Sequence, residues 1–418
     1  MSQSSPFVPR KRPAKITGLV RHTALKLLSR SLREGEALAE FEEAISKRLE
    51  GREVAAVGSG RFALILLLRS LGITPPSTIL MASYNASCVP NALQAAGYTI
   101  HFLDIDRDTL HLDPSKLPKK APAGSAALIV THLEGCPVDM PKLLSWAKKN
   151  KLRVIEDAAH ALGATVEGRP VGTLADGAIF SLGRGKHLNT MGGGLAVAGD
   201  SESGSLLKSF ADELPTDSSL DLTKAVVMEG VVATGTNPAI FKAVAAPPLR
   251  LARRWGLDPM ASLFEDAKDR LDGIPLAWQR RLSDLQAKFG LEALDGFDRS
   301  LVRRREIAQR LIAGLDGVLP MQRALDDSDP AWLELTVLVN NRSAFQRALL
   351  ARGIDTQHTW MDACDTLDAF QSASGGPCPV SRDVNMQALY LPTYASLTDA
   401  QCDHVIRSVC DIVAQGGA

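Results

Sequence analysis

The sequence predicts an α/β fold: a large domain whose mainly parallel sheet is sandwiched by helices, followed by a smaller C-terminal α+β domain. Short β-rich runs alternate with helical runs of about ten residues from 31 to 200, as in parallel sheets covered on both faces. The alternation stops over 201–280, and a second mixture of strands and helices occupies 332–413. The length of 418 residues also exceeds what one compact core usually holds.

These changes in pattern predict the domain boundaries. Residues 1–30 form an N-terminal arm, 31–280 the large domain and 281–418 the small domain. The start of the chain is polar and basic and has no apolar run typical of a signal peptide, so we interpret it as solvated. The large domain ends in an atypical apolar insertion at about 205–280. This insertion fits a helical subdomain, a dimer contact or a segment at a membrane surface.

Each element follows from a local pattern. Aliphatic and β-branched runs that end at Gly or polar residues predict strands at 54–57, 79–82, 99–103, 126–131, 152–155, 177–181 and 194–198. Apolar residues at helical spacing predict helices at 38–49, 62–71, 90–96 and 140–149. The second of these is so apolar that we expect it to be buried. Beyond the insertion, the patterns predict a long charged helix, a strand and two further helices at 282–315, 335–339, 343–352 and 399–413.

Composition and charge narrow the class of protein. Lys and Arg number 47 and Asp and Glu also number 47, so the formal net charge is zero and nucleic acid is not expected as a partner. The six cysteines are spread without a CxxC pair, which indicates reduced thiols of a cytoplasmic enzyme. The eight histidines show no metal-binding spacing, and no apolar run of about 18 residues predicts a spanning helix.

The first candidate site is the turn Gly58-Ser59-Gly60-Arg61, between a short strand and an apolar helix. A helix N-terminus offers N–H groups and the positive end of the helix dipole, so it binds phosphate well. Glycine lets the backbone approach the ligand, and Arg61 adds a guanidinium that can bind phosphate oxygens in pairs. A plain turn would have the same residues.

Asp157 and His160 form the second candidate site, directly after the strand 152–155. A carboxylate beside the nitrogen of a pyridine cofactor keeps that nitrogen protonated, and the protonated ring is an electron sink. His160 lies close to one helical turn further and could face the same ligand. Alternatively, Asp157 caps a helix and His160 is a structural histidine.

The third candidate site is SLGRGKH at 181–187, with three glycines at 192–194. A lysine forms a Schiff base only when part of its population is neutral, which burial and a nearby cation such as Arg184 achieve. Ser181 could donate to a phosphate. Without the other motifs, Lys186 would be interpreted as a surface lysine.

The order of the three sites points to one cofactor. A phosphate turn comes first, Asp157 follows roughly a hundred residues later, and Lys186 follows Asp157 by 29 residues. Fold-type I enzymes that use pyridoxal 5'-phosphate (PLP) have this order. We therefore expect PLP as a Schiff base on Lys186.

On these motifs the chain resembles the DegT/DnrJ/EryC1/StrS family of PLP-dependent aminotransferases. The most specific matches are VIEDAAHALGA at 154–164 and the stretch 181–194. LSDLQA at 282–287 and LYLPTYASLT at 389–398 are similar to the family's small domain. The resemblance leaves out the insertion. It implies the fold-type I PLP-transferase fold and a homodimer with the active site at the interface.

The resemblance also implies roles for individual residues. Lys186 would be the Schiff-base lysine and acid–base catalyst, and Asp157 would pair with the pyridine nitrogen. His160 would lie beside the ring and its phenolic oxygen. Ser181 and the turn formed by Ser59, Gly60 and Arg61 would bind the phosphate.

The chain departs from the family pattern at the substrate end of the site. Arg61 stands where a small hydroxyl residue is usual, and Glu134 where an aromatic residue is common. The usual ring-stacking aromatic falls on Ala86, which leaves Tyr84 as the candidate for stacking on PLP. The turn 183–185 lacks the usual aromatic-proline-threonine pattern.

The implied activity is transfer of an amino group from glutamate or glutamine to a keto or aldehyde acceptor, by default a keto-sugar nucleotide. The altered substrate end and the apolar insertion leave a more apolar or carrier-bound acceptor open. Two other classes also stay open. One is a PLP enzyme of another reaction type, such as elimination, decarboxylation or oxidation; the other is a non-catalytic homologue with a regulatory or binding role.

Overall fold

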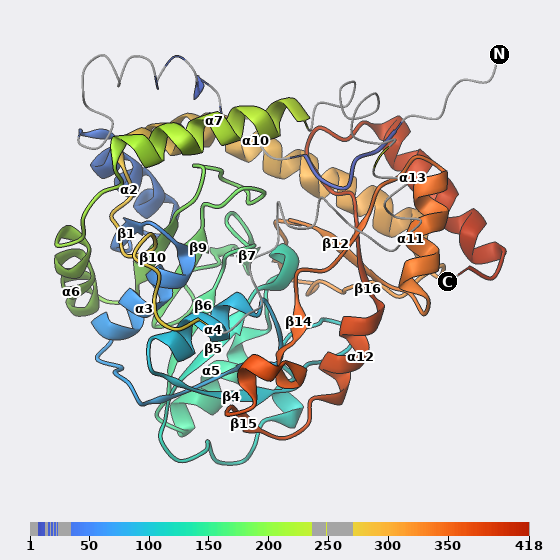
Figure 1. The fold of residues 1–418 in the computed structure, drawn as a ribbon. Helices are drawn as coiled ribbons and strands as arrows, with labels where there is room; N and C mark the ends of the chain where they lie inside the picture. The colour runs from blue at the N-terminus through green and yellow to red at the C-terminus, as the bar shows by residue number, and fades with distance from the viewer. Residues whose placement is uncertain are drawn as a thin grey trace.

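The structure is a computed structural model that describes residues 7–12, 35–235 and 271–417, and the single residues 16, 18, 19, 21, 23 and 248. An eight-stranded sheet lies at the centre of these parts (Figure 1). In spatial order its strands are β1 (Val54–Val57), β10 (Gly194–Ala198), β9 (Gly177–Ser181), β6 (Arg153–Asp157), β5 (Ser125–Thr131), β2 (Thr78–Ala82), β4 (Thr99–Leu103) and β15 (Ser374–Gly375). Pairing is parallel from β15 to β9 and antiparallel on both sides of β10. The predicted α/β class with a mainly parallel sheet is confirmed.

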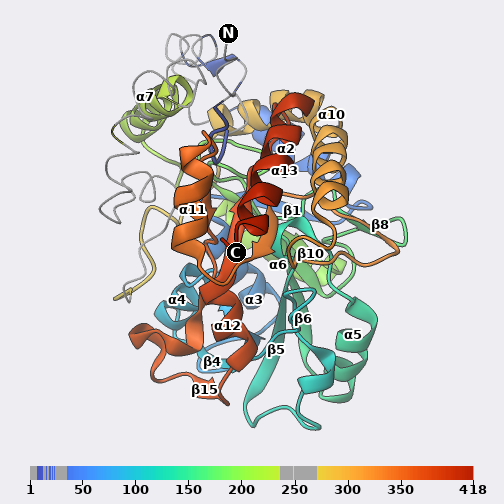
Figure 2. The same ribbon diagram turned by 90° about the vertical axis from the view of Figure 1, so that its right-hand side faces the viewer.

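Helices cover both faces of this sheet (Figure 2). They are α3 (Gly60–Ser70), α4 (Cys88–Ala95) and α6 (Ser201–Asp212) on one face and α2 (Ala37–Arg48) and α5 (Met140–Lys149) on the other. Consecutive strand residues point to opposite faces. Ala55 and Val57 of β1 therefore pack with α3, whereas Val54 and Ala56 pack with α2. As predicted, α3 is buried on nearly all sides.

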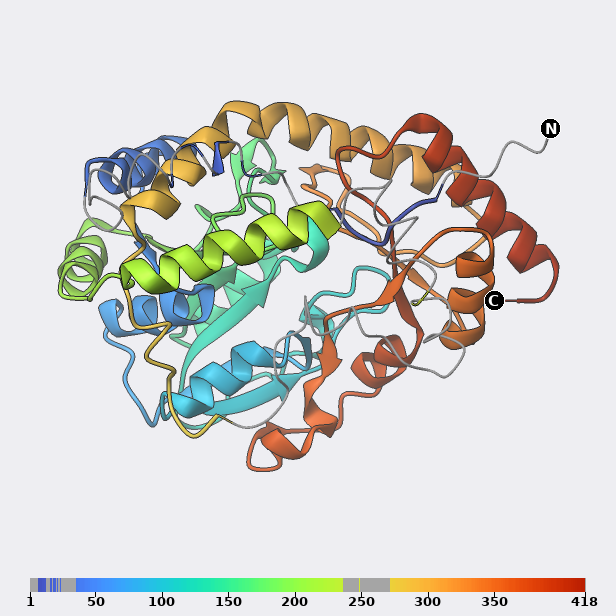
Figure 3. The ribbon, with the colours of Figure 1, turned by 45° about the horizontal axis from the view of Figure 1, so that its top comes forward.

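The C-terminal part builds a smaller antiparallel sheet and also returns to the large one. The small sheet consists of β12 (Leu335–Leu338), β16 (Ala388–Leu391) and β13 (Gln357–His358). The helices α11 (Arg342–Ala351) and α13 (Asp399–Ala414) pack on it together with the end of α10 (Asp284–Leu315). The long helix α10 runs from α2 to α13 across one side of the molecule (Figures 1 and 3).

Short elements join these two parts. They are β3 (Tyr84–Asn85), which pairs with β14 (Asp362–Ala363), the sheet of β7 (Thr165–Val166), β8 (Arg169–Pro170) and β11 (Ser328–Asp329), and α12 (Pro379–Gln387). Because β14 and β15 follow β12 in the chain, the segment after α10 contacts both sheets.

Of the predicted apolar insertion, the structure describes 205–235 and 271–280, including α7 (Ser219–Gly235). The residues between them, on which the choice among subdomain, dimer contact and membrane-surface segment depends, lie outside the described residues. The helix α7 crosses above the sheet (Figure 3), and its beginning packs against the beginning of α10 through Leu222, Leu285 and Phe289. Within the described ranges, no helix combines the length and the apolar character needed to span a membrane.

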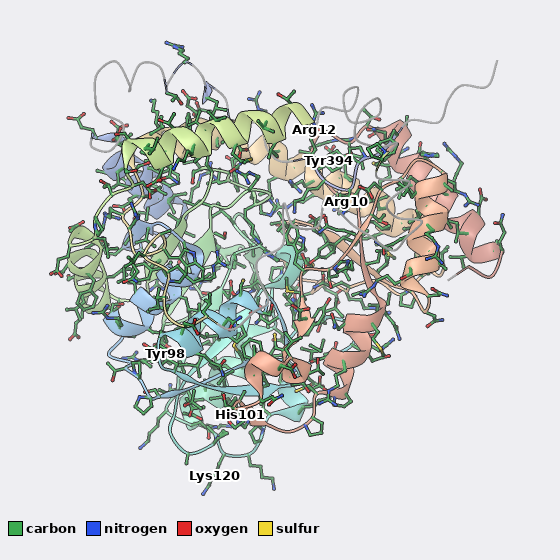
Figure 4. All side chains as sticks on the ribbon, in the orientation of Figure 1. Arg10, Arg12, Tyr98, His101, Lys120 and Tyr394 are labelled. Atoms are coloured by element: carbon green, nitrogen blue, oxygen red, sulfur yellow. The ribbon has the colours of Figure 1, made fainter. Side chains whose placement is uncertain are left out.

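The interpretation of the chain start as a solvated arm is wrong for residues 7–12, which are mostly buried. The carbonyl of Val8 accepts the N–H of Asp355 at 2.9 Å. Arg10 Nε lies 2.6 Å from Asp355 Oδ2, and Lys11 Nζ lies 2.7 Å from Glu334 Oε1. Figure 4 labels Arg10 on the side of the small sheet. A basic stretch can be buried when acids elsewhere in the fold pair with it, and here Glu334 and Asp355 do so.

Candidate functional site

A cavity of about 220 Å³ lies at the carboxyl ends of β6 and β9, beside the N-terminus of α3. Residues 59–61, Asp157, His160, Ser181 and Lys186 all line it. They meet because the carboxyl ends of neighbouring parallel strands lie at the same edge of a sheet. Seven of the eight residues predicted to bind the cofactor are thus brought together, and Tyr84 is not among the lining residues.

The turn 59–61 opens α3 directly after β1. Ser59 is extended, and its Oγ accepts the N–H of Arg61 at 3.2 Å, which is an N-cap arrangement. The Arg61 guanidinium lies 4.0 Å from the centre of the Trp278 ring, and its Nε donates to Ser59 Oγ. A hydroxyl, a guanidinium and the N-terminal N–H groups of a helix therefore converge here, as an anion requires.

The strand β6 ends in two acids with different surroundings. Glu156 does not line the cavity; its carboxylate accepts the N–H groups of Gly172, Leu174 and Ala175 at 2.7–3.1 Å and so holds the segment after β8. Its neighbour Asp157 lines the cavity. Burial raises the pKa of Asp157, so a cation beside this carboxylate would favour its ionised form.

Lys186 follows β9 in a tight turn. Its N–H donates to the carbonyl of Gly183 at 3.1 Å, and Gly185 has a φ of +87°, which glycine adopts without strain. Burial, followed by the charge of Lys11, lowers the pKa of Lys186 to about 8. An appreciable fraction of its Nζ is then uncharged near neutral pH, which suits a nucleophile and a base. Arg184, expected to supply the cation, instead pairs with Glu229 of α7 at 2.8 Å.

His160 faces the site as a neutral imidazole. Its Nδ1 accepts the backbone N–H of Glu134 at 3.3 Å, and burial lowers its pKa. The hydrogen of the neutral ring is then on Nε2, which makes that atom a donor. Oε2 of Glu134 lies 3.4 Å from the same Nδ1. Glu134 is itself buried, with a φ of 56°, and the Tyr390 hydroxyl donates to its Oε1.

Tyr84, the residue expected to stack on the cofactor ring, does not line the cavity. Its short strand β3 pairs with β14, and alternate residues of a strand point to opposite sides. Asn85 and Ala86 line the cavity, whereas the Tyr84 hydroxyl donates to Thr359 Oγ1 at 3.0 Å within a buried cluster. This geometry gives Tyr84 a packing role instead.

Two residues outside the predicted motifs lie beside Lys186. The centre of the Trp360 ring is 3.6 Å from Lys11 Nζ and 5.2 Å from Lys186 Nζ. No local sequence pattern identifies Lys11 as a site residue, because its ion-pair partner Glu334 is 323 residues away in the sequence. Trp360 belongs to a part of the chain without a recognisable motif.

Comparisons with known proteins cover most of the chain. The model of the DegT/DnrJ/EryC1/StrS aminotransferase family matches residues 20–213 and 249–410. The spore coat polysaccharide biosynthesis protein SpsC of Bacillus subtilis is 26% identical, with 97% of each chain covered. The dTDP-3-amino-3,4,6-trideoxy-alpha-D-glucose transaminase of Streptomyces venezuelae is 30% identical, over 90% of this chain and 86% of that protein.

Solved structures are similar over the same length. The structure of S. venezuelae DesV in complex with a ketimine intermediate superposes with a TM-score of 0.74 at 25% identity. The superposition covers 98% of this chain and 99% of that chain. The similarity therefore includes the strands whose ends form the cavity.

Proposed function

Since the chain belongs to the DegT/DnrJ/EryC1/StrS aminotransferase family, and is therefore a PLP-dependent aminotransferase, we propose that it transfers the amino group of glutamate or glutamine to a keto-sugar nucleotide. One observation carries the proposal: residues 59–61, Asp157, Ser181 and Lys186 come from distant parts of the sequence and line one cavity. The same set would serve any PLP reaction, and the family supplies the reaction type.

The turn 59–61 and Ser181 suit the phosphate of PLP. An added Cβ on Gly194 would lie 2.3 Å from Gly60 Cα, so the backbones of these two glycines touch at the turn. Ser181 Oγ accepts the N–H of Gly183 at 3.3 Å, which leaves its own hydrogen for a phosphate oxygen. We assign the phosphate to this end of the cavity.

The opposite end suits the pyridine ring. The Asp157 carboxylate, whose pKa burial raises, would be stabilised by a protonated ring nitrogen and would keep that nitrogen protonated. The Nε2–H of His160 provides a donor for the phenolic oxygen of the ring. We therefore assign the ring to the space between Asp157 and Lys186.

When bound, PLP supplies an electron sink for negative charge on the carbon next to the amino nitrogen. Lys186 supplies the other chemical functions. Its Nζ would hold the cofactor covalently and would also serve as the acid–base group that takes and returns a proton. The lowered pKa of Lys186 suits both functions, because a neutral Nζ can attack a carbonyl and take a proton from carbon.

The acceptor class rests on the relatives. The S. venezuelae relative is named for a dTDP-linked amino sugar, and we propose an acceptor of that class here, a sugar nucleotide with a ketone. We also propose a homodimer with the site at the interface. In support, α7 exposes Leu220, Val227 and Val231, while its Glu229 pairs with Arg184 beside the Lys186 turn.

Absorbance spectroscopy tests the proposal. Protein incubated with PLP and then dialysed should keep a visible absorption band, and borohydride should fix the cofactor on the peptide that contains Lys186. Glutamate or glutamine should bleach the band and release the matching 2-oxo acid. A dTDP- or UDP-linked keto sugar should then restore the band.

Lys186→Ala should lose the covalently fixed cofactor, whereas Lys47→Ala, at an exposed lysine of α2, should behave as wild type. A cofactor that borohydride still fixes in Lys186→Ala would contradict the assignment of this lysine. A wild-type band that neither glutamate nor glutamine bleaches would contradict the proposed donors.

A further inference from the structure

The N-terminal segment 7–12 reaches the turn that carries Lys186. A Cβ added to Gly185 would lie 2.8 Å from Cε and 3.2 Å from Nζ of Lys11, so Lys11 packs directly against this turn. Both lysines also approach the ring of Trp360, with Nζ 3.6 Å from its centre for Lys11 and 5.2 Å for Lys186. The two nitrogens are therefore less than about 9 Å apart.

Buried contacts hold Lys11 in this position. Its side chain is 6% exposed, and Nζ lies 2.7 Å from Glu334 Oε1. The preceding Arg10 donates to both carboxylate oxygens of Asp355, at 2.6 Å from Nε and 3.0 Å from Nη2. Removing a lysine from water is costly unless an acid pairs with it. Two buried ion pairs thus fix this segment beside Lys186.

Titratable groups face Lys186 from several elements. They are Lys11 on the N-terminal segment, Cys88 on α4, Glu134 on η2 (Leu133–Gly135), Asp157 on β6 and His160 after β6. Burial is the largest cause of the lowered pKa of Lys186, and the charge of Lys11 is the next. Glu134 and Asp157 act in the opposite direction.

We propose that Lys11 is a positioning residue of the active site, which acts on Lys186 from behind the Gly185 turn by its charge, which the ion pair with Glu334 stabilises, and by filling that space. The proposal rests on the proposed role of Lys186 as the residue that binds PLP. Lys11 is not among the residues that line the cavity. It therefore acts through Lys186 and Trp360 and not by contact with a substrate.

Coulomb's law gives the size of the expected effect. Two unit charges less than about 9 Å apart, at an effective dielectric constant of about 20, change a pKa by about one unit or more. Loss of the Lys11 charge should therefore raise the pKa of Lys186. A variant that lacks only Lys11 would leave Glu334 buried without its ammonium partner, so the better variant is Lys11→Met with Glu334→Gln, which keeps the volume of both side chains.

Competitive labelling of the cofactor-free protein with acetic anhydride, read by mass spectrometry over a pH series, measures the pKa of Lys186. In Lys11→Met with Glu334→Gln this pKa should rise by less than about one unit, because Glu334→Gln also removes a nearby negative charge, which opposes the effect of Lys11 on Lys186. In Glu134→Gln it should fall. Lys11→Arg keeps the charge and should leave it near the wild-type value. Arg12→Gln is the matched control, because it removes a charge from the next residue, whose guanidinium donates to Ser396.

An unchanged pKa of Lys186 in the double variant, with wild-type circular dichroism, would overturn the proposal. A Lys11→Arg protein that shifts as far as the double variant would do the same, because charge would then not be the cause. If the double variant does not fold, Lys11→Gln gives the same test with a hydrogen bond to Glu334 retained. The labelling needs neither PLP nor substrate, so its result is independent of whether the proposed aminotransfer occurs.

Discussion

Replacing Gly194 by alanine is expected to weaken PLP binding. Gly194 begins β10 and pairs with Val57 of β1, next to the turn that opens α3. An added Cβ would lie 2.3 Å from Cα and N of Gly60 and 2.7 Å from the carbonyl carbon of Ser59. The φ of Gly194 lies outside the left-handed range, so the substitution meets a steric cost alone.

The size of the effect follows from this overlap. Non-bonded carbon atoms approach favourably to about 3.5 Å, so the new methyl group overlaps Gly60 by about 1 Å. The new Cβ is attached directly to the backbone and the atoms of Gly60 that it meets are backbone atoms, so no side-chain rotamer can relieve the overlap. Overpacking of this kind costs about 1–3 kcal/mol. If β10 moves away from residues 59–61 and the same energy is lost from PLP binding, the affinity for PLP falls roughly 5- to 150-fold, since about 1.4 kcal/mol corresponds to a tenfold change in affinity.

Fluorescence titration of the cofactor-free protein with PLP measures this affinity, and urea unfolding checks that the fold is intact. Gly296→Ala in α10 is the matched control, because nothing lies within 4 Å of its added Cβ. It should bind PLP as wild type does. Wild-type affinity in Gly194→Ala would refute the assignment of the phosphate to residues 59–61.

Three further outcomes are expected. Glu156→Gln should lower the free energy of unfolding in urea by about 3–5 kcal/mol. The reason is that the NH₂ group of the buried amide would face backbone N–H groups whose hydrogens the Glu156 carboxylate now accepts. A change below about 1 kcal/mol would contradict this explanation. Tyr84→Phe should lower the free energy of unfolding by about 1 kcal/mol, because the hydrogen bond to Thr359 is lost, and should leave the affinity for PLP unchanged. A loss of PLP affinity would instead indicate that Tyr84 contacts the cofactor. Burial raises the pKa of Asp157 above 3.8, so wild-type stability falls as this group ionises with rising pH. In the cofactor-free state, the melting temperature of Asp157→Asn should therefore be higher than that of wild type, and the difference should grow as the pH rises above 3.8. A difference that becomes smaller with rising pH would contradict the raised pKa of Asp157.

Local patterns predicted that the residues assigned to the cofactor would lie together, and they do line one cavity. Asp157 and Ser181 each end a strand that the sequence identifies by its own aliphatic run, and parallel strands present such ends at one edge of the sheet. The turn 59–61 needed only a strand, two glycines and an apolar helix. The roles of these residues toward PLP stay predictions until the titrations above are made.

Residues whose surroundings depend on distant segments could not be predicted in this way. Tyr84 points away from the cavity because β3 pairs with β14, which lies in the C-terminal part of the chain. Lys11 is buried because Glu334 meets it there. No local pattern contains either pairing. The division at 280 and 281 into large and small domains stays a prediction, as does the cytoplasmic location.

The buried position of residues 7–12 bears on how the chain is made. Val8 bonds to Asp355, and Lys11 bonds to a residue 323 positions later, so neither contact can form until most of the polypeptide has left the ribosome. Contacts between such distant residues form slowly. A nascent chain that already contains Lys186 would therefore still have an open flank beside it, and a truncated translation product would stay in that state. Lys186 acquires its full surroundings only after synthesis is nearly finished.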